Sequence, residues 1–161
     1  MKKIIISPYA RALPIKKRNA KNYPWFKEIV EELNKIGYYV IQIGTKEEKE
    51  IEGVKEFIKN KTIEEIAKIL KDSYLWISVD NMVQHLANTI NKRGIVIYGK
   101  SNPKNFGYSQ NINVIKDEKY FRKDQFSWWM NEDFDDNVFV KPDKIIEIVK
   151  DFIEVAPHEG A

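Results

Sequence analysis

The stretch Tyr74–Asn88, YLWISVDNMVQHLAN, is the most informative about the fold, because it runs from an apolar segment through a polar turn into a helical pattern. The apolar segment predicts a buried strand over residues 74–79, and the pattern that follows predicts a helix over residues 82–90. Asp80 and Asn81 occupy the turn between them. A hydrophobic core needs no such polarity, whereas an anionic ligand is favoured by the free N–H groups at a helix start.

The helix after this turn has two chemically different faces. On a helical wheel the apolar residues share one face: Met82, Val83, Leu86, Ala87 and Ile90. The polar residues Gln84, His85 and Asn88 share the other. A competing interpretation is that Asp80 or Asn81 only caps the helix and that the lone histidine is exposed or packs on a loop, which is the usual case. The position at a strand end favours a binding site.

Strand and helix patterns alternate along the whole chain. The predicted strands are Lys3–Ser7, Tyr38–Ile43, Tyr74–Val79, Gly94–Tyr98 and Asn111–Ile115. The helices between and after them start near Pro24, at the capping boxes Thr45–Glu48 and Thr62–Glu65, at Met82 and at Pro142. This alternation predicts a parallel sheet with helices on both faces. We therefore expect α/β class, with one Rossmann-like, doubly wound domain over residues 1–161.

Ligands of such sheets bind beyond the carboxyl ends of the strands. The predicted strands end at Ser7-Pro8-Tyr9, Gly44-Thr45, Ser78–Asn81 and Tyr98–Lys100. Gly99 would allow close backbone approach to a ligand and Lys100 would meet a phosphate, although this segment also fits an ordinary turn. No GxGxxG or Walker A sequence follows any strand, which excludes a standard dinucleotide fingerprint and a P-loop NTPase.

Composition excludes several other kinds of site. The chain has 161 residues, 43% of them hydrophobic, and no cysteine, so disulfides and thiolate chemistry are absent. With His85 and His158 as the only histidines, we predict no metal site and no cofactor. The acids of Glu132–Asp136 lack EF-hand spacing and fit a solvated turn. Because no signal peptide or membrane span is recognisable, we expect a soluble cytoplasmic protein that does not bind membranes.

Positive charge is concentrated near the amino terminus. The net charge is +3, yet no acid precedes Glu28. This basic segment suits a phosphate-bearing ligand, or it is a solvated loop. Nucleic-acid binding through Arg11, Lys16–Arg18 and Lys21 is a weaker hypothesis, because no recognition motif accompanies the charge. The pair Trp128-Trp129 could stack on a base or sugar, or anchor a loop to the body.

The order of these pieces resembles the carboxyl-terminal half of the heptosyltransferases, GT-B glycosyltransferases that use ADP-heptose. IIISPYA resembles the first strand and small-residue loop of that half, and KNYPWFKEIVEELNKIGYYVIQIG its lysine and following helix and strand. KTIEEIAKILKDSYLWIS resembles its threonine-led helix and next strand. DNMVQHLA stands where the family has Asp-Ser-Gly, two residues and His-Leu-Ala, and Tyr98-Gly99 where it has Phe-Gly. The resemblance covers nearly the whole chain.

The resemblance implies a site for the nucleotide diphosphate of a sugar donor. In the family the lysine that matches Lys21 meets phosphate, the aspartate that matches Asp80 contacts the donor sugar, and the helix start near Asn81 lies close to the diphosphate. This chain departs from the family in having Asn81-Met82 for Ser-Gly. The predicted ligand-binding residues are Ser7, Tyr9, Lys21, Thr45, Asp80, Asn81, Met82, His85, Tyr98, Gly99 and Lys100.

The amino-terminal half of the family, which binds the acceptor and supplies the catalytic carboxylate, has no counterpart in this sequence. We therefore expect a stand-alone domain that binds or sequesters an ADP-containing nucleotide, nucleotide sugar or nucleotide signal without glycosyl transfer. In this reading no residue is catalytic. The alternative is a glycosyltransferase that works with a separate amino-terminal half or as a homodimer, since transfer needs a positioned acceptor and a base.

Overall fold

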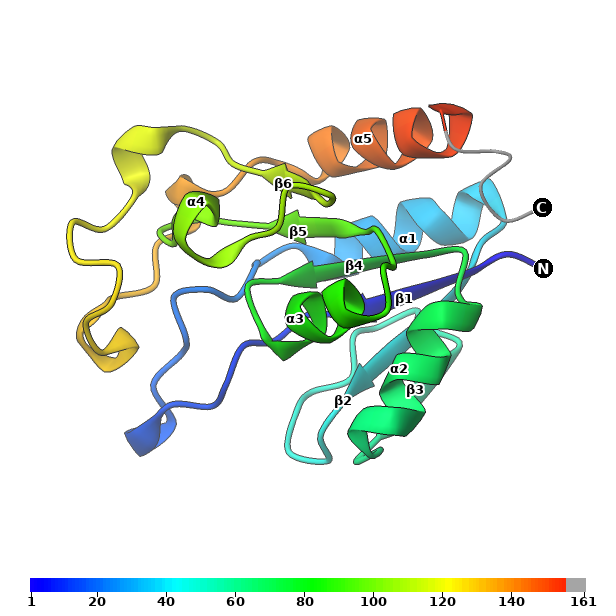
Figure 1. The fold of residues 1–161 in the computed structure, drawn as a ribbon, viewed down its shortest axis with the longest axis horizontal. Helices are drawn as coiled ribbons and strands as arrows, with labels where there is room; N and C mark the ends of the chain where they lie inside the picture. Colours follow the sequence, from blue (N-terminus) through cyan, green and yellow to red (C-terminus); the bar gives the residue numbers. More distant parts are fainter. Residues whose placement is uncertain (156–161) are drawn as a thin grey trace.

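The computed structural model describes residues 1–155 and contains one six-stranded sheet (Figure 1). The strands are β1 (Lys3–Ser7), β2 (Tyr39–Gly44), β3 (Glu56–Lys59), β4 (Leu75–Val79), β5 (Ile95–Ile97) and β6 (Ile112–Val114). All neighbours pair in parallel, in the order β3-β2-β1-β4-β5-β6. This is the strand order of a Rossmann sheet, so the predicted fold class is confirmed. The strand order reverses between β1 and β4, where such sheets bind ligands.

Two layers of helices cover the two faces of the sheet. The helices are α1 (Phe26–Ile36), α2 (Ile63–Asp72), α3 (Met82–Thr89), α4 (Pro103–Phe106) and α5 (Pro142–Val155). α1 contacts α5 on one face and α2 contacts α3 on the other (Figure 1). Each face has its own apolar cluster: Ile4 and Ile6 of β1 point toward the α1/α5 layer, and Ile5 belongs to the cluster on the opposite face. Because neighbours on a strand face opposite ways, the run IIIS serves both layers.

Most predicted elements are confirmed within one or two residues, but the capping box at Thr45 is wrong as a helix signal. Thr45 to Glu48 forms a turn closed by a hydrogen bond from Glu48 N to Thr45 O (3.2 Å), and the chain continues into β3, a strand that we did not predict. The buried Gln42 side chain holds this connection, since its amide bonds Lys49 O and Ile51 N. Thr62 does start a helix, with both bonds of its capping box to Glu65 present.

Two long loops project from the carboxyl end of the sheet (Figure 1). One follows β1 and contains the short 3₁₀ turn η1 (Pro14–Lys16). The other follows β6 and contains η2 (Glu118–Tyr120), η3 (Trp129–Asn131) and η4 (Asp136–Val138). Within residues 1–155, no helix combines the length and the apolar character needed to cross a membrane. His158 lies outside the described residues.

Candidate functional site

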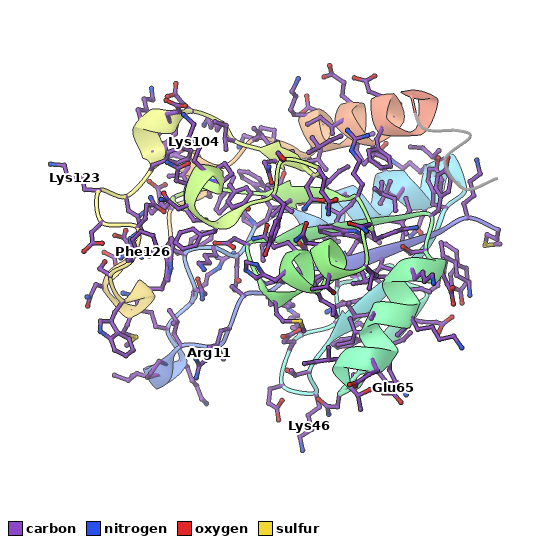
Figure 2. The ribbon with its side chains drawn as sticks, viewed as in Figure 1. Arg11, Lys46, Glu65, Lys104, Lys123 and Phe126 are labelled. Atoms are coloured by element: carbon purple, nitrogen blue, oxygen red, sulfur yellow. The ribbon has the colours of Figure 1, made fainter. Side chains whose placement is uncertain are left out.

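A cavity of about 1690 Å³ opens at the carboxyl end of the sheet, between the loops that follow β1, β2 and β4 and the loop that follows β6. Most of the predicted ligand-binding residues line it: Ser7, Tyr9, Lys21, Thr45, Asp80, Asn81, Met82 and His85. A small-molecule site commonly occupies roughly 300–1,000 Å³, so this cavity has room for an extended ligand. Arg11 and Phe126, which belong to the two long loops, lie at the same end of the molecule (Figure 2).

An ion pair between Lys21 and Asp80 forms the floor of the cavity. Lys21 Nζ lies 3.1 Å from Asp80 Oδ2, and the two side chains are 18% and 4% exposed. The other carboxylate oxygen, Oδ1, accepts a hydrogen bond of 2.6 Å from Gln84 Nε2. Gln84 Oε1 in turn accepts a hydrogen bond of 2.9 Å from the hydroxyl of Tyr98. Asp80 is therefore fixed on both sides, and Lys21 is its cationic partner, which also lines the cavity.

This chain of contacts corrects the expected faces of α3. Gln84, which we placed on the polar face, is fully buried, and its amide is satisfied between Asp80 and Tyr98. Met82, which we placed on the apolar face, is 47% exposed and lines the cavity. Burial, and then the charge of Asp80, raise the pKa of Tyr98, so its hydroxyl stays protonated and donates.

Asn81 is the N-cap of α3 and also ties three segments together. Its Oδ1 accepts from Val83 N (2.9 Å), as a cap should. Its Nδ2 lies 3.0 Å from Ser7 Oγ and 3.1 Å from Tyr9 O, so the same side chain holds the loop after β1 against the helix start. Asparagine can do both because it carries an acceptor and two donors. The first turn of α3 thus faces the cavity, beside Lys21.

The loop after β1 is held in place mainly by asparagine side chains. Asn19, which is buried, accepts from Lys21 N (2.9 Å) and donates to Arg11 O (2.9 Å). Asn22 Oδ1 accepts from Ala10 N (2.8 Å). These bonds replace regular secondary structure and fix the backbone that presents Lys21. Of the basic residues predicted in this loop, Arg11 and Lys21 line the cavity.

On the β2 side the cavity has a polar arm, which we define as Thr45, Glu48, Asn60 and Lys61. Burial, with a smaller contribution from the charge of Glu47, raises the pKa of the Glu48 carboxyl. Burial and the charge of Glu48 also raise the pKa of Tyr9. A methyl group at Gly44 would collide with the Glu48 carboxylate, so this glycine leaves the room that the carboxylate fills.

On the β5 side the cavity has an aromatic arm, which we define as Phe106, Phe126, Trp128 and Trp129. Phe106 and Phe126 meet edge to face, with 5.4 Å between ring centroids. Trp129 lies close to two cations: Lys21 Nζ is 4.7 Å and the Arg122 guanidinium 4.2 Å from the ring centroid. Trp129 therefore anchors its loop next to the ion pair, as one of our two interpretations expected.

Three predicted residues do not line the cavity. Tyr98 is 1% exposed, and its hydroxyl donates a hydrogen bond to Gln84. Gly99 is a packing glycine, because a Cβ there would collide with Phe139 and Val138. Lys100 is engaged by the Glu132 carboxylate (3.3 Å) and the Asp133 carbonyl (2.8 Å), so it does not reach a phosphate in the cavity.

The acid cluster near residue 132 pairs with cations of the protein. Glu132 also lies 3.2 Å from Arg122 Nε, and Asp133 lies 3.2 Å from Lys17 Nζ. Asp135 accepts from Asn137 N (3.0 Å). Over the described residues, histidine and acidic side chains form no cluster of three that could hold a metal ion.

His85 lines the cavity but is already partnered. Its Nδ1 lies 2.8 Å from the Tyr108 hydroxyl, and the two rings meet edge to face. Sequence reasoning missed Glu48, Asn60, Lys61 and Phe106 as site residues. For Glu48 a signal existed, since an acid near the end of the second strand of a Rossmann sheet commonly bonds a ribose hydroxyl.

Comparison with known proteins places this geometry in a family. Residues 2–127 match the family described as glycosyltransferase family 9 (heptosyltransferase). Comparison with curated protein sequences gives no match. Among solved structures, the E. coli ADP-heptose LPS heptosyltransferase II superposes on 99% of this chain with a TM-score of 0.69 and 15% identity. E. coli heptosyltransferase WaaC with ADP superposes on 93%, with a TM-score of 0.66 and 13% identity.

The dodecameric iron-containing glycosyltransferase TibC of enterotoxigenic E. coli H10407 superposes on 88% of the chain, with a TM-score of 0.61 and 15% identity. The superposed regions are 48%, 44% and 37% of these three enzymes, so the chain spans about half of their length or less. The family match extends over most of the chain, and the fold agrees with it. The chain belongs to glycosyltransferase family 9, the heptosyltransferase family.

Proposed function

We propose that the cavity binds an ADP-containing nucleotide sugar, with its diphosphate over Lys21 and the first turn of α3. The observation that carries this proposal is the Lys21–Asp80 pair at the point where the strand order reverses. A lysine amine and the N–H groups of a helix start together favour a multiply charged anion. Two of the similar structures are described with ADP or with ADP-heptose as ligand or substrate, which supports adenine as the base.

The polar arm suits the nucleoside. Glu48 follows β2, the position from which an acid commonly accepts hydrogen bonds from ribose hydroxyls in Rossmann sheets. Its carboxylate fills the room beside Gly44 and lines the same cavity as Lys21. A nucleotide with its ribose at Glu48 and its phosphates at Lys21 would therefore follow the carboxyl edge of the sheet from β2 to β4.

We further propose that this domain binds the nucleotide sugar without transferring the sugar, and so can sequester it. Transfer needs a base near an acceptor hydroxyl. The carboxylates that line the cavity are Asp80 and Glu48. Asp80 is 3% exposed and has one oxygen at Lys21 and the other at Gln84, which leaves it poorly placed to take a proton from an acceptor.

The alternative is a glycosyltransferase in which a separate amino-terminal half or a second copy supplies the acceptor side. Membership in the family and a length of about half of the similar enzymes favour it. In that case Lys21 and Asp80 would hold the donor and the other part would supply the base.

One experiment tests the nucleotide-sugar binding that both proposals require, and also whether the chain by itself removes the sugar. The purified protein is incubated with ADP-heptose, washed, denatured by heat, and the released molecules are identified by mass spectrometry. Intact ADP-heptose in an amount close to that of the protein is the expected result. Release of ADP with loss of the sugar would favour the enzyme, and recovery of neither molecule would contradict nucleotide binding.

A further inference from the structure

The two tryptophans of Phe126–Met130, FSWWM, have different surroundings. Trp129 lies close to Lys21 and Arg122. Trp128 is 82% exposed and Phe126 is 76% exposed, and both line the cavity. Large aromatic side chains that remain in water at the mouth of a cavity are a common sign of a binding surface. The proposed contacts of the nucleotide with Lys21 and the polar arm do not involve these two side chains.

The segment that presents Trp128 is held firmly. Arg122 N donates to Lys100 O (3.0 Å), and Gln125 bonds Lys100 O, Arg122 O and Asn102 N. At its far end Glu132 is paired with both Lys100 and Arg122. The Trp128 backbone is therefore fixed to the loop after β5 before any ligand arrives, which lowers the entropic cost of using its ring as a contact.

The loop after β1 also contacts this segment. Lys17 Nζ donates to Met130 O (2.6 Å) and lies 3.2 Å from Asp133. The Arg18 guanidinium lies 3.5 Å from the centroid of the Phe134 ring. Residues 128–131 lie beyond the stretch that matches the family, yet they line the cavity.

We propose that Trp128, with Phe126, is the platform for the sugar ring carried by the nucleotide's distal phosphate. This inference rests on the proposed nucleotide binding. A nucleotide sugar is a linear molecule whose diphosphate joins the nucleoside to the sugar. With the nucleoside in the polar arm and the diphosphate at Lys21, the sugar extends to the β5 side, where the aromatic arm lies. The C–H face of a sugar ring is apolar and packs against a flat aromatic ring, while its hydroxyls stay in water.

The test compares two ligands on matched variants by titration calorimetry, with ADP and ADP-heptose as probes. Trp128→Ala should weaken ADP-heptose binding roughly tenfold, within the range seen when a stacking aromatic is removed, and leave ADP within twofold of wild type. Trp128→Phe should restore most of the loss, because it keeps a flat ring. Since Trp128 is largely exposed, neither change should unfold the protein.

The outcomes separate this inference from the proposed function. If wild type binds ADP and Trp128→Ala weakens both ligands equally, the platform holds the base and the inference is overturned. If the variant binds both ligands as wild type does, the ring contacts neither and the inference is again overturned. If wild type binds neither ligand, the proposed function fails and the inference fails with it.

Discussion

The polar arm and the aromatic arm line the same cavity as Lys21, but they are built by opposite means. The polar arm consists of short connections next to β2, β3 and α2, and its Glu48 lies in a turn that the neighbouring strand fixes. The aromatic arm comes largely from a long segment without regular strands, which side-chain bonds and ion pairs hold in place. The family match covers the first arm fully and the second only in part. Short connections between regular elements therefore build the polar arm, whereas a long irregular loop builds most of the aromatic arm.

The largest effect is expected from a change of Lys21, because the diphosphate is proposed to lie over this residue, in the cavity that both arms line. Lys21→Met should weaken ADP binding roughly 100-fold, since charge-assisted hydrogen bonds contribute about 1.5–3 kcal/mol each. Titration calorimetry measures the loss, and Lys16→Met is the matched control, being an exposed lysine of the same loop. Wild-type affinity in a folded Lys21→Met variant would contradict the placement of the diphosphate.

The same change also tests the fold, because it leaves Asp80 buried without its cation. Removing one partner of a buried pair commonly costs about 3–5 kcal/mol. The double variant Lys21→Met/Asp80→Asn removes both charges and should recover part of that stability without recovering ADP binding. Urea denaturation measures the stability of each variant.

A substitution at Glu48 tests the polar arm alone. Glu48→Gln should weaken ADP roughly tenfold, which corresponds to about 1.4 kcal/mol, because a neutral amide accepts ribose hydroxyl bonds less strongly than a carboxylate. Glu47→Gln, next to it and exposed, should change binding by less than twofold. Equal effects of the two substitutions would remove Glu48 from the site.

The pH dependence of ADP binding also tests the role of Glu48. The folded pKa of Glu48 is raised, so this carboxylate takes up a proton at a higher pH than an ordinary glutamate does. Binding that needs the ionised form should therefore fall as pH is lowered through that raised pKa. The phosphates of ADP also protonate, with a pKa of about 6, but they do so equally for wild type and Glu48→Gln. The difference between the two titration curves isolates Glu48, and parallel curves would contradict its role.

The helix starts beside the two arms give a smaller, purely structural contrast. Thr62 caps α2 within its own capping box, whereas Asn81 caps α3 and also bonds Ser7 and Tyr9. Loss of an N-cap costs about 0.5–2 kcal/mol. Asn81→Ala should therefore lower the free energy of unfolding by more than Thr62→Ala does. Equal losses in urea denaturation would show that the links from Asn81 to the loop after β1 contribute nothing.

The smallest effect is expected at the outer rim, where Lys17 joins the two long loops. The Lys17–Asp133 pair has side chains 27% and 93% exposed, and exposed pairs contribute about 0–1 kcal/mol. Lys17→Ala should change stability by about 1 kcal/mol or less and leave ADP affinity within twofold. A much larger loss of ADP affinity would mean that the loop position, and not Lys21 alone, determines nucleotide binding.

Five of the six strands and most helices were predictable from sequence because their signals are local, whereas β3 was missed. Two capping-box patterns show the limit: Thr62 is followed by an apolar stripe that can be buried, whereas Thr45 is followed by KEEKEIEG. Without an apolar face to pack, a short helix is not stable, so the pattern at Thr45 forms a turn. Local motifs therefore need a packing surface before they predict an element.

The site was predictable only where the resemblance or a strand end pointed to it. Lys21, Asp80 and Asn81 follow from those signals and line one cavity. The burial of Gln84 depends on Tyr98, and the aromatic arm depends on pairs such as Arg122 with Glu132, all of which are contacts between separate elements. No periodicity in the sequence indicates such contacts. The pair Trp128-Trp129 could therefore be singled out by its composition, but the arrangement that holds it on the β5 side could not be predicted.

The most direct test of the central claim is titration calorimetry of the wild-type protein with ADP and with AMP under identical conditions. If the diphosphate lies over Lys21 and the start of α3, ADP should bind in close to equal amount to protein and at least tenfold tighter than AMP, which lacks the distal phosphate. Equal affinity for ADP and AMP, or no binding of either, would contradict a diphosphate site at this junction.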